Sequence, residues 1–425
     1  MTRAPKHRLR ERGSATGPSA VALAAIALLL APRPGSATTP PPPDPTPKIR
    51  DVRVLVGDDV SRVRIAASRP ILVETPSGER REESGALPLV LNGAAARLVR
   101  FAGAAGSPPR PMVLTSAEAL RVEFERDGAW SAPAALPGWL KLIPNGNGTT
   151  DVINEIDVEN YVACVTANEV WPTFEKEAFR GQAIVTRSFV LYQMTRRPNA
   201  EADVSATQGS QVYRGIRDDA TGRKAAEAAE FTAGLVLTCP GRDGRDQMFC
   251  AYYSAACGGR SQPAAPLGAE GDVEPLRGGV ECNYCSIAPK DAYRWGPVSL
   301  PVDEAFSRLV GRYPDAADLG GLAEVSVVER TTSGRPLTLR LRGPSGATYD
   351  ILSERFRLAL GGSVVRSTEC RIRVRDQEVI VDEGKGFGHG LGLCQWGMQG
   401  QALQGRQAAE ILRFYYPGSK LKRVY

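Results

Sequence analysis

The chain changes character at one stretch, Asp157-Val-Glu-Asn-Tyr-Val-Ala-Cys-Val-Thr-Ala-Asn-Glu-Val-Trp-Pro172. Its first residue has the short acceptor side chain that favours a helix N-cap, and Tyr161 and Val165 follow at helical spacing. The closing Trp-Pro ends the helix, because proline disfavours helical backbone in the residue before it. We therefore predict a helix that ends close to Glu169, at a corner from which its carboxyl can project into a cleft.

A second, longer helix is predicted beyond this corner. Thr173 can cap it, and Glu175 and Glu177 would lie in its first turn, where the helix dipole favours acids. Apolar residues recur at steps of three, four or seven up to about Met194, which predicts one buried stripe.

The rest of the chain mixes strands with shorter helices, so the expected fold class is α+β, with a helical core around Glu169. Residues 49–150 form a β-rich N-terminal region, since apolar and charged side chains alternate with a period of two, as in Arg62-Val-Arg-Ile65. The further expected elements are a helix near 220–232, a hairpin of Val325–Val328 with Leu337–Leu341, strand between Val364 and Val381, and a last helix at Gln407–Tyr416.

Residues 1–37 have the pattern of an export signal, with basic residues before a short apolar run and a small-residue end. They carry six Lys/Arg against Glu11, a net +5 out of +6 for the chain, so the remainder is nearly neutral. No basic stripe points to nucleic acid. A proline-rich linker follows at 38–48. The protein is expected outside the cytoplasm, in the periplasm, the cell envelope or the medium; an uncleaved anchor is the alternative.

A glycine-rich segment, Gly386-Phe-Gly-His-Gly-Leu-Gly-Leu-Cys-Gln-Trp-Gly397, holds the only histidine outside the export signal. Such glycine density lets backbone approach a ligand closely. His389 and Gln395 are candidate donors to sugar oxygens, and Trp396 is a candidate stacking face. A phosphate-binding loop is not indicated, because no lysine-serine pair follows at the required spacing.

Cys250, Cys257, Cys282 and Cys285 form a Cys-x6-Cys … Cys-x2-Cys set among eight cysteines. Four thiolates at such spacing can hold a structural zinc ion. In an exported protein the same residues can instead form two disulfides. The sequence leaves both interpretations open.

Four motifs in order resemble the SpoIID/LytB family of peptidoglycan-acting proteins, over about residues 151–425. They are Tyr161-Val-x-x-Val-x-x-Asn-Glu-Val-Trp-Pro with the following Glu177-Ala-x-x-Gly-Gln-Ala-x-x-x-Arg-Ser188, then Gln211-Val-Tyr-Arg-Gly215, then Cys257-Gly-Gly-Arg-Ser261, and the glycine-rich segment closed by Tyr415-Tyr-Pro-Gly418. One departure stands out: family members often have histidine, in some cases described as binding metal, where this chain has Tyr253.

The resemblance implies peptidoglycan glycan strands as the target. One implied activity is a lytic transglycosylase that cuts denuded MurNAc-GlcNAc strands with Glu169 as its single acid and base, without a cofactor for the chemistry. The other is a non-catalytic glycan-binding enhancer, whose partner would be a cell-wall amidase. The expected substrate contacts are Arg187, Gln182, Ser188, His389, Gln395 and Trp396.

Arg187 follows Glu169 by 18 residues, about five helical turns, and is expected to face the cleft if the second helix packs beside the first, where it would hold Glu169 or a sugar carbonyl. A cysteine peptidase using Cys164 or Cys394 with His389 is disfavoured, because neither cysteine has a nucleophile-loop signature.

Overall fold

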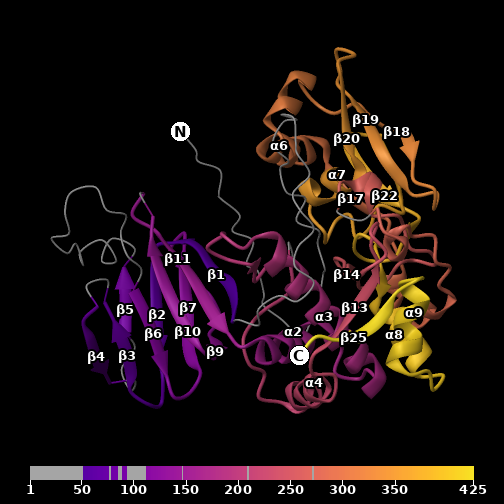
Figure 1. Cartoon of the computed structure of the whole chain (residues 1–425). Helices are drawn as coiled ribbons and strands as arrows, with labels where there is room; N and C mark the ends of the chain where they lie inside the picture. The colour runs from indigo at the N-terminus through magenta and orange to yellow at the C-terminus, as the bar shows by residue number, and fades with distance from the viewer. Residues whose placement is uncertain are drawn as a thin grey trace, which may run out of the picture.

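The computed structural model describes residues 51–75, 78–84, 89–92, 112–145, 147–207, 210–269 and 272–425. The predicted export signal and proline-rich linker lie outside these residues. Figure 1 shows a β-rich N-terminal part beside a group of helices, and a second β-containing part on the other side of them. The fold class is α+β, as predicted.

Two sheets make up the N-terminal part. The larger has the strand order β12-β1-β11-β10-β6-β3-β4, and the smaller has the order β5-β2-β7-β8, with β9 also paired to β7. The strands are β1 Val52–Val60, β2 Arg62–Ala66, β3 Ile71–Glu74, β4 Arg80–Glu83, β5 Leu89–Asn92, β6 Met112–Ser116, β7 Leu120–Arg126, β8 Ala129–Trp130, β9 Ala134–Leu136, β10 Trp139–Pro144, β11 Thr150–Ile156 and β12 Val204–Ser205.

The predicted period of two is confirmed in β2 and β7, which pair antiparallel. Val63 and Ile65 are buried, while Arg64 on the opposite face forms an ion pair with Glu123 of the neighbouring strand. Alternating side chains point to opposite faces of a sheet, so one face joins the core and the other carries charge pairs.

The helical core follows β11. It contains α2 Val158–Glu169, α3 Lys176–Arg196, α4 Ala220–Phe231, α8 Gln395–Ala402 and α9 Ala408–Tyr415, with the sheet β14-β13-β25 (Asp246–Met248, Leu235–Pro240, Lys420–Arg423) and the parallel pair β15 Tyr253–Ser254 and β24 Leu393–Cys394. One continuous hydrophobic core joins these helices to the N-terminal sheets. The predicted helices near 220–232 and 407–416 are confirmed.

The two predicted caps at the corner differ in outcome. The Asp157 side chain accepts hydrogen bonds from the backbone N–H groups of Glu159 and Asn160, both at 3.0 Å, as expected for an N-cap. The Thr173 cap is wrong, because α3 begins later, at Lys176. The N–H of Glu175 instead donates to the side chain of Gln399 in α8, at 2.7 Å, so a distant helix satisfies this terminus.

The stretch of chain that runs from β16 Arg294–Trp295 to β23 Gly384–Lys385 forms a second, separate hydrophobic core. The strands β16 and β23 pair antiparallel. The elements of this core are β17 Val298–Pro301, α6 Val302–Arg312, β18 Glu324–Arg330, β19 Pro336–Arg342, β20 Thr348–Leu352, α7 Ser353–Leu360, β21 Arg371–Arg375 and β22 Glu378–Asp382. The predicted hairpin is confirmed as β18 and β19. Strand forms only in the second half of the predicted 364–381 stretch.

Short helical segments complete the described chain: α5 Lys290–Tyr293, η1 Ala265–Leu267, η2 Glu274–Leu276, η3 Asn283–Ile287 and η4 Pro314–Leu319. Among the described residues, no helix combines the length and the apolar character needed to cross a membrane.

Candidate active site and candidate metal centre

Glu169 is the last residue of α2, and the backbone turns away directly after it at Val170. The predicted corner between two helices is therefore confirmed. The side chain is only 2% exposed. A buried carboxyl at a helix end needs hydrogen-bond partners, since an unpaired one would be strongly destabilising.

Those partners come from three other segments. The backbone N–H of Val212 donates to Oε1 of Glu169 at 2.8 Å, and the hydroxyl of Tyr253 donates to the same oxygen at 2.9 Å. Nε2 of Gln395 donates to the backbone carbonyl of Glu169 at 3.1 Å and lies 3.5 Å from Oε2. It also donates to Oε1 of Gln182, at 3.2 Å. The structure thus brings the predicted Gln395 and Gln182 to the acid.

Burial raises the pKa of Glu169 from 4.5 to about 7. The hydrogen bonds from Val212, Tyr253 and Gln395 oppose this rise, and so does the positive charge of Arg214. A carboxyl with such a pKa is populated in both protonation states near neutral pH, which is the property required of a group that gives up a proton and takes one back.

Aromatic side chains lie close in sequence to the acid and to its partner Gln395, since Trp171 is two residues after Glu169 and Trp396 directly follows Gln395. Trp396 contacts Trp171 edge-to-face at 5.7 Å between ring centroids and Phe174 at 4.9 Å. Both tryptophans are partly exposed, whereas Phe174 is buried. Partly exposed indole rings beside a buried acid are a suitable face for stacking a sugar ring.

Arg187 and Ser188 do not reach this site. The Arg187 guanidinium is fully buried and binds Glu159 of α2 with two hydrogen bonds, at 2.8 and 2.5 Å. The Ser188 hydroxyl donates to the Ile184 carbonyl and accepts from the N–H of Leu237. The expected contact between Arg187 and Glu169 is therefore wrong. Both residues hold α3 to its neighbours.

His389 is buried, and its Nδ1 accepts from the backbone N–H of Leu391 at 2.9 Å. Burial, together with the nearby charges of Arg357 and Arg335, lowers the pKa of His389 to about 3, so the imidazole is neutral. Its ring meets Tyr252 edge-on at 6.3 Å. In the described residues no hydrogen bond joins it to Glu169, so the two ends of the predicted site do not pair directly.

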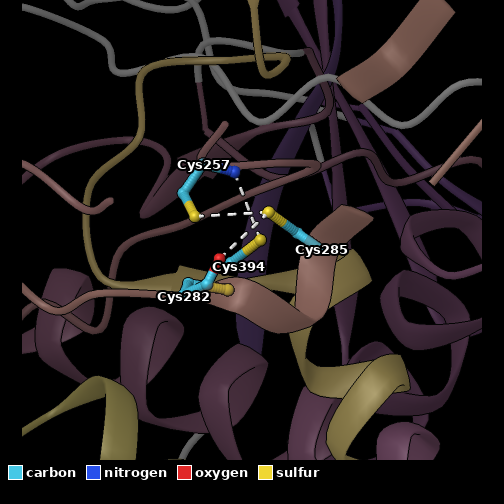
Figure 2. A group of neighbouring side chains, drawn as sticks. All are labelled: Cys257, Cys282, Cys285 and Cys394. Atoms are coloured by element: carbon cyan, nitrogen blue, oxygen red, sulfur yellow. Dashed lines mark hydrogen bonds between the residues drawn. The ribbon is translucent and has the colours of Figure 1, made fainter. Parts of the chain in front are cut away.

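Four cysteine sulfurs lie together in a buried cluster, within 4.8 Å of one another: Cys257, Cys282, Cys285 and Cys394 (Figure 2). The sulfurs of Cys257 and Cys285 are 3.7 Å apart. Zinc bound to four thiolates at about 2.3 Å places its sulfurs about 3.8 Å apart, so the group fits a tetrahedral ion. The cluster could thus hold a structural metal such as zinc.

Hydrogen bonds within and around the cluster act on its sulfurs. The Cys394 sulfur accepts from the backbone N–H groups of Cys257 and Gly397, at 3.2 and 3.3 Å. Hydrogen bonding from the Cys257 thiol lowers the pKa of Cys282 and of Cys285, whereas the hydrogen bond to Cys282 raises the pKa of Cys257 and burial raises the pKa of Cys394. N–H donors around metal-bound sulfur stabilise its negative charge.

Cys250, which was expected in this set, lies outside it and accepts from Gln193 Nε2 at 3.6 Å. Its place is taken by Cys394, which the parallel pairing of β15 and β24 carries to the other three. No disulfide is assigned to any of the eight cysteines, all of which lie within the described residues.

Sequence reasoning missed four contributors to the acid's environment: Tyr253, Val212, Gln211 and Arg214. Tyr253 had been noted only as a departure from the family pattern. Gln211 and Val212 belong to a quoted motif, but nothing in a single sequence shows that this loop folds onto the end of α2.

A family model described as "SpoIID: Stage II sporulation protein" matches residues 146–239. An uncharacterized protein of Brachyspira hyodysenteriae is 30% identical over 288 residues, which cover 66% of this chain and 70% of that protein. Stage II sporulation protein D of Bacillus subtilis is 25% identical over 322 residues, covering 71% and 87%. The amidase enhancer of Bacillus subtilis is 25% identical over 295 residues, 60% of this chain but 39% of the enhancer.

Proposed function

Since the chain belongs to the SpoIID family, we propose that it is an exported peptidoglycan-acting protein that cuts denuded glycan strands as a lytic transglycosylase, with Glu169 as its single acid and base. The observation that carries the proposal is the environment of Glu169: a fully buried carboxyl in the family's helix-corner motif, with a pKa raised to about 7.

The reaction needs only one carboxyl. Protonated Glu169 gives its proton to the glycosidic oxygen between MurNAc C1 and GlcNAc, and the C1–O bond breaks. The C6 hydroxyl of the same MurNAc attacks C1, and its proton returns to the carboxylate. The products are a GlcNAc end and a 1,6-anhydro-muramyl end, and no water is consumed.

A hydrolytic glycosidase normally uses two carboxyls, one as acid and one as base or nucleophile. In the described part of the chain, the groups that hydrogen-bond to Glu169 or shift its pKa include no second carboxylate. This supports the lytic over the hydrolytic reaction. Trp171 and Trp396 would supply the sugar-stacking face, and the exposed Arg214, close enough to lower the pKa of Glu169, marks the side that a substrate would approach.

The alternative is a non-catalytic, glycan-binding enhancer of a cell-wall amidase. It is favoured by one observation, the similarity to the protein named amidase enhancer. In that case Glu169 and the tryptophans would bind sugar without cutting it.

The cysteine cluster supports a second, structural proposal: one zinc ion held by Cys257, Cys282, Cys285 and Cys394. No step of the sugar chemistry passes through it. Cys394 directly precedes Gln395, so the ion would fix the start of α8 and with it the amide that contacts Glu169.

Mass analysis of denuded glycan strands, incubated with residues 38–425, tests the activity. We expect anhydro-muramyl ends with the natural chain and none with Glu169→Gln, which keeps the size of the side chain but loses its titratable proton. Normal turnover by the variant would disprove the single-acid mechanism. Glycan binding without cleavage by the natural chain would instead support the enhancer function.

A further inference from the structure

A chain of buried hydrogen bonds leads to Oε1 of Glu169, whereas Gln395 lies nearer to Oε2. The hydroxyl of Tyr161 donates to Oε1 of Gln211 at 2.9 Å. Nε2 of Gln211 donates to the hydroxyl of Tyr253 at 3.3 Å, and that hydroxyl donates to Oε1 of Glu169 at 2.9 Å. All four side chains are buried, so water does not compete for these groups.

The hydrogen bonds of this series all point in one direction, with each donor farther from Glu169 than its acceptor. The Gln211 amide accepts from Tyr161 through its oxygen and donates through its nitrogen, so the Tyr253 oxygen already receives a hydrogen. The one hydrogen of the Tyr253 hydroxyl is thereby left for Glu169. The backbone N–H of Val212 donates to the same Oε1. A proton on Oε1 would face two donor hydrogens and break at least one of these bonds.

We propose that Tyr253 and Gln211 are positioning residues, which keep the acidic proton of Glu169 on Oε2, the oxygen that would deliver it to the substrate. The inference rests on the proposed function and adds to it which oxygen reacts and what selects it. Oε2 is suited to release a proton, since its hydrogen bond within the described part of the chain is the long one from Gln395, at 3.5 Å.

The charged and titratable groups around Glu169 agree with this assignment. They are Tyr253, Tyr161 and Arg214. Burial and the charge of Glu169 raise the pKa of both tyrosines well above its ordinary value, so both hydroxyls keep their protons and remain donors at neutral pH. The Tyr253 hydrogen bond favours the ionised form of the acid, whose pKa is otherwise raised by burial.

Tyr253→Phe tests the inference, with Tyr213→Phe as the matched control. Tyr213 is also buried and stacks on Tyr161 at 5.5 Å, but its hydroxyl donates to Asn154 at 2.5 Å. Both changes delete one buried hydroxyl, and only the first removes a donor to Glu169. Infrared titration follows the carboxyl band of Glu169, identified by its loss in Glu169→Gln. Turnover on glycan strands gives kcat and KM.

For Tyr253→Phe we expect the pKa of Glu169 to rise and kcat to fall roughly ten- to a hundred-fold with KM changed less than about two-fold, because the proton is no longer confined to Oε2. Tyr161→Phe frees the Gln211 amide to turn, and we expect a smaller rise in the same direction. Tyr213→Phe should leave both quantities near the natural values.

Equal pKa values of Glu169 in Tyr253→Phe and Tyr213→Phe would overturn the inference, even if kcat differed between them. A natural chain that forms no anhydro-muramyl ends would refute the proposed lytic activity instead. The infrared titration would still decide whether the hydrogen-bond chain acts on Glu169, so the two failures are distinguishable.

Discussion

Replacing Glu169 by glutamine is expected to make the folded chain more stable above neutral pH and to remove a large part of its pH dependence. The pKa of Glu169 is raised from 4.5 to about 7 by burial, so the folded state holds the proton more tightly than the unfolded state. This group therefore lowers the stability of the folded chain as pH rises from about 4.5 to about 7, and the loss is complete above that pH.

The difference of pKa corresponds to roughly 3 kcal/mol of unfolding free energy. No discount for solvent screening applies, because the carboxyl is fully buried. Glutamine keeps an oxygen that can accept from Val212 and Tyr253, and it does not titrate. Urea unfolding of both proteins at pH 5, 6, 7 and 8, followed by tryptophan fluorescence, gives the difference in stability at each pH. A difference that stays constant over this range would refute the buried, neutral-range acid.

The metal centre and the role of Arg187 give two further predictions. We expect elemental analysis to find about one zinc ion per chain. The ion should be lost in Cys394→Ser and retained in Cys250→Ser, because a tetrahedral sulfur site needs all four ligands. Equal zinc in both variants, or none in the natural chain, would contradict the assignment. Arg187→Met should lower the unfolding free energy by about 2 to 3 kcal/mol, less than for a fully buried pair since the Glu159 side chain is 27% exposed. Turnover per folded molecule should be unchanged, and a loss of kcat at full stability would return Arg187 to the active site.

Local features were predictable from the sequence because their causes are local. The end of α2 at Glu169 follows from the Trp-Pro pair, and the charge pairing of β2 with β7 follows from a period of two. The cap of α3 was not predictable, because the group that satisfies the N–H of Glu175 is Gln399, more than two hundred residues away.

The difference between local and long-range causes also explains which features of the site could be predicted. Whether Arg187 faces Glu169 depends on how α3 packs beside α2, and counting helical turns across the bend at Val170 does not give the rotational phase of α3. Cys394 lies far in sequence from the other three cysteines, and only the pairing of β15 with β24 brings it to them. The role expected for His389 as a sugar contact stays a prediction, and its Nδ1 accepts a local hydrogen bond from the N–H of Leu391.

The segment 296–383 begins and ends at one pair of antiparallel strands, in which Trp295 lies opposite Gly384. A Cβ at Gly384 would come within 2.2 Å of the Trp295 indole ring, so position 384 admits only glycine. Because its two ends lie side by side, such a unit can be lengthened, trimmed or exchanged over evolutionary time without a change in the connectivity of the rest of the fold. Several contacts limit that freedom: the buried Arg335 reaches out of the unit, donates to the Cys257 carbonyl and packs against Gly390, and Arg366 forms an ion pair with Asp291 at 2.9 Å. Any exchange that drops Arg335 removes its hydrogen bond to the Cys257 carbonyl.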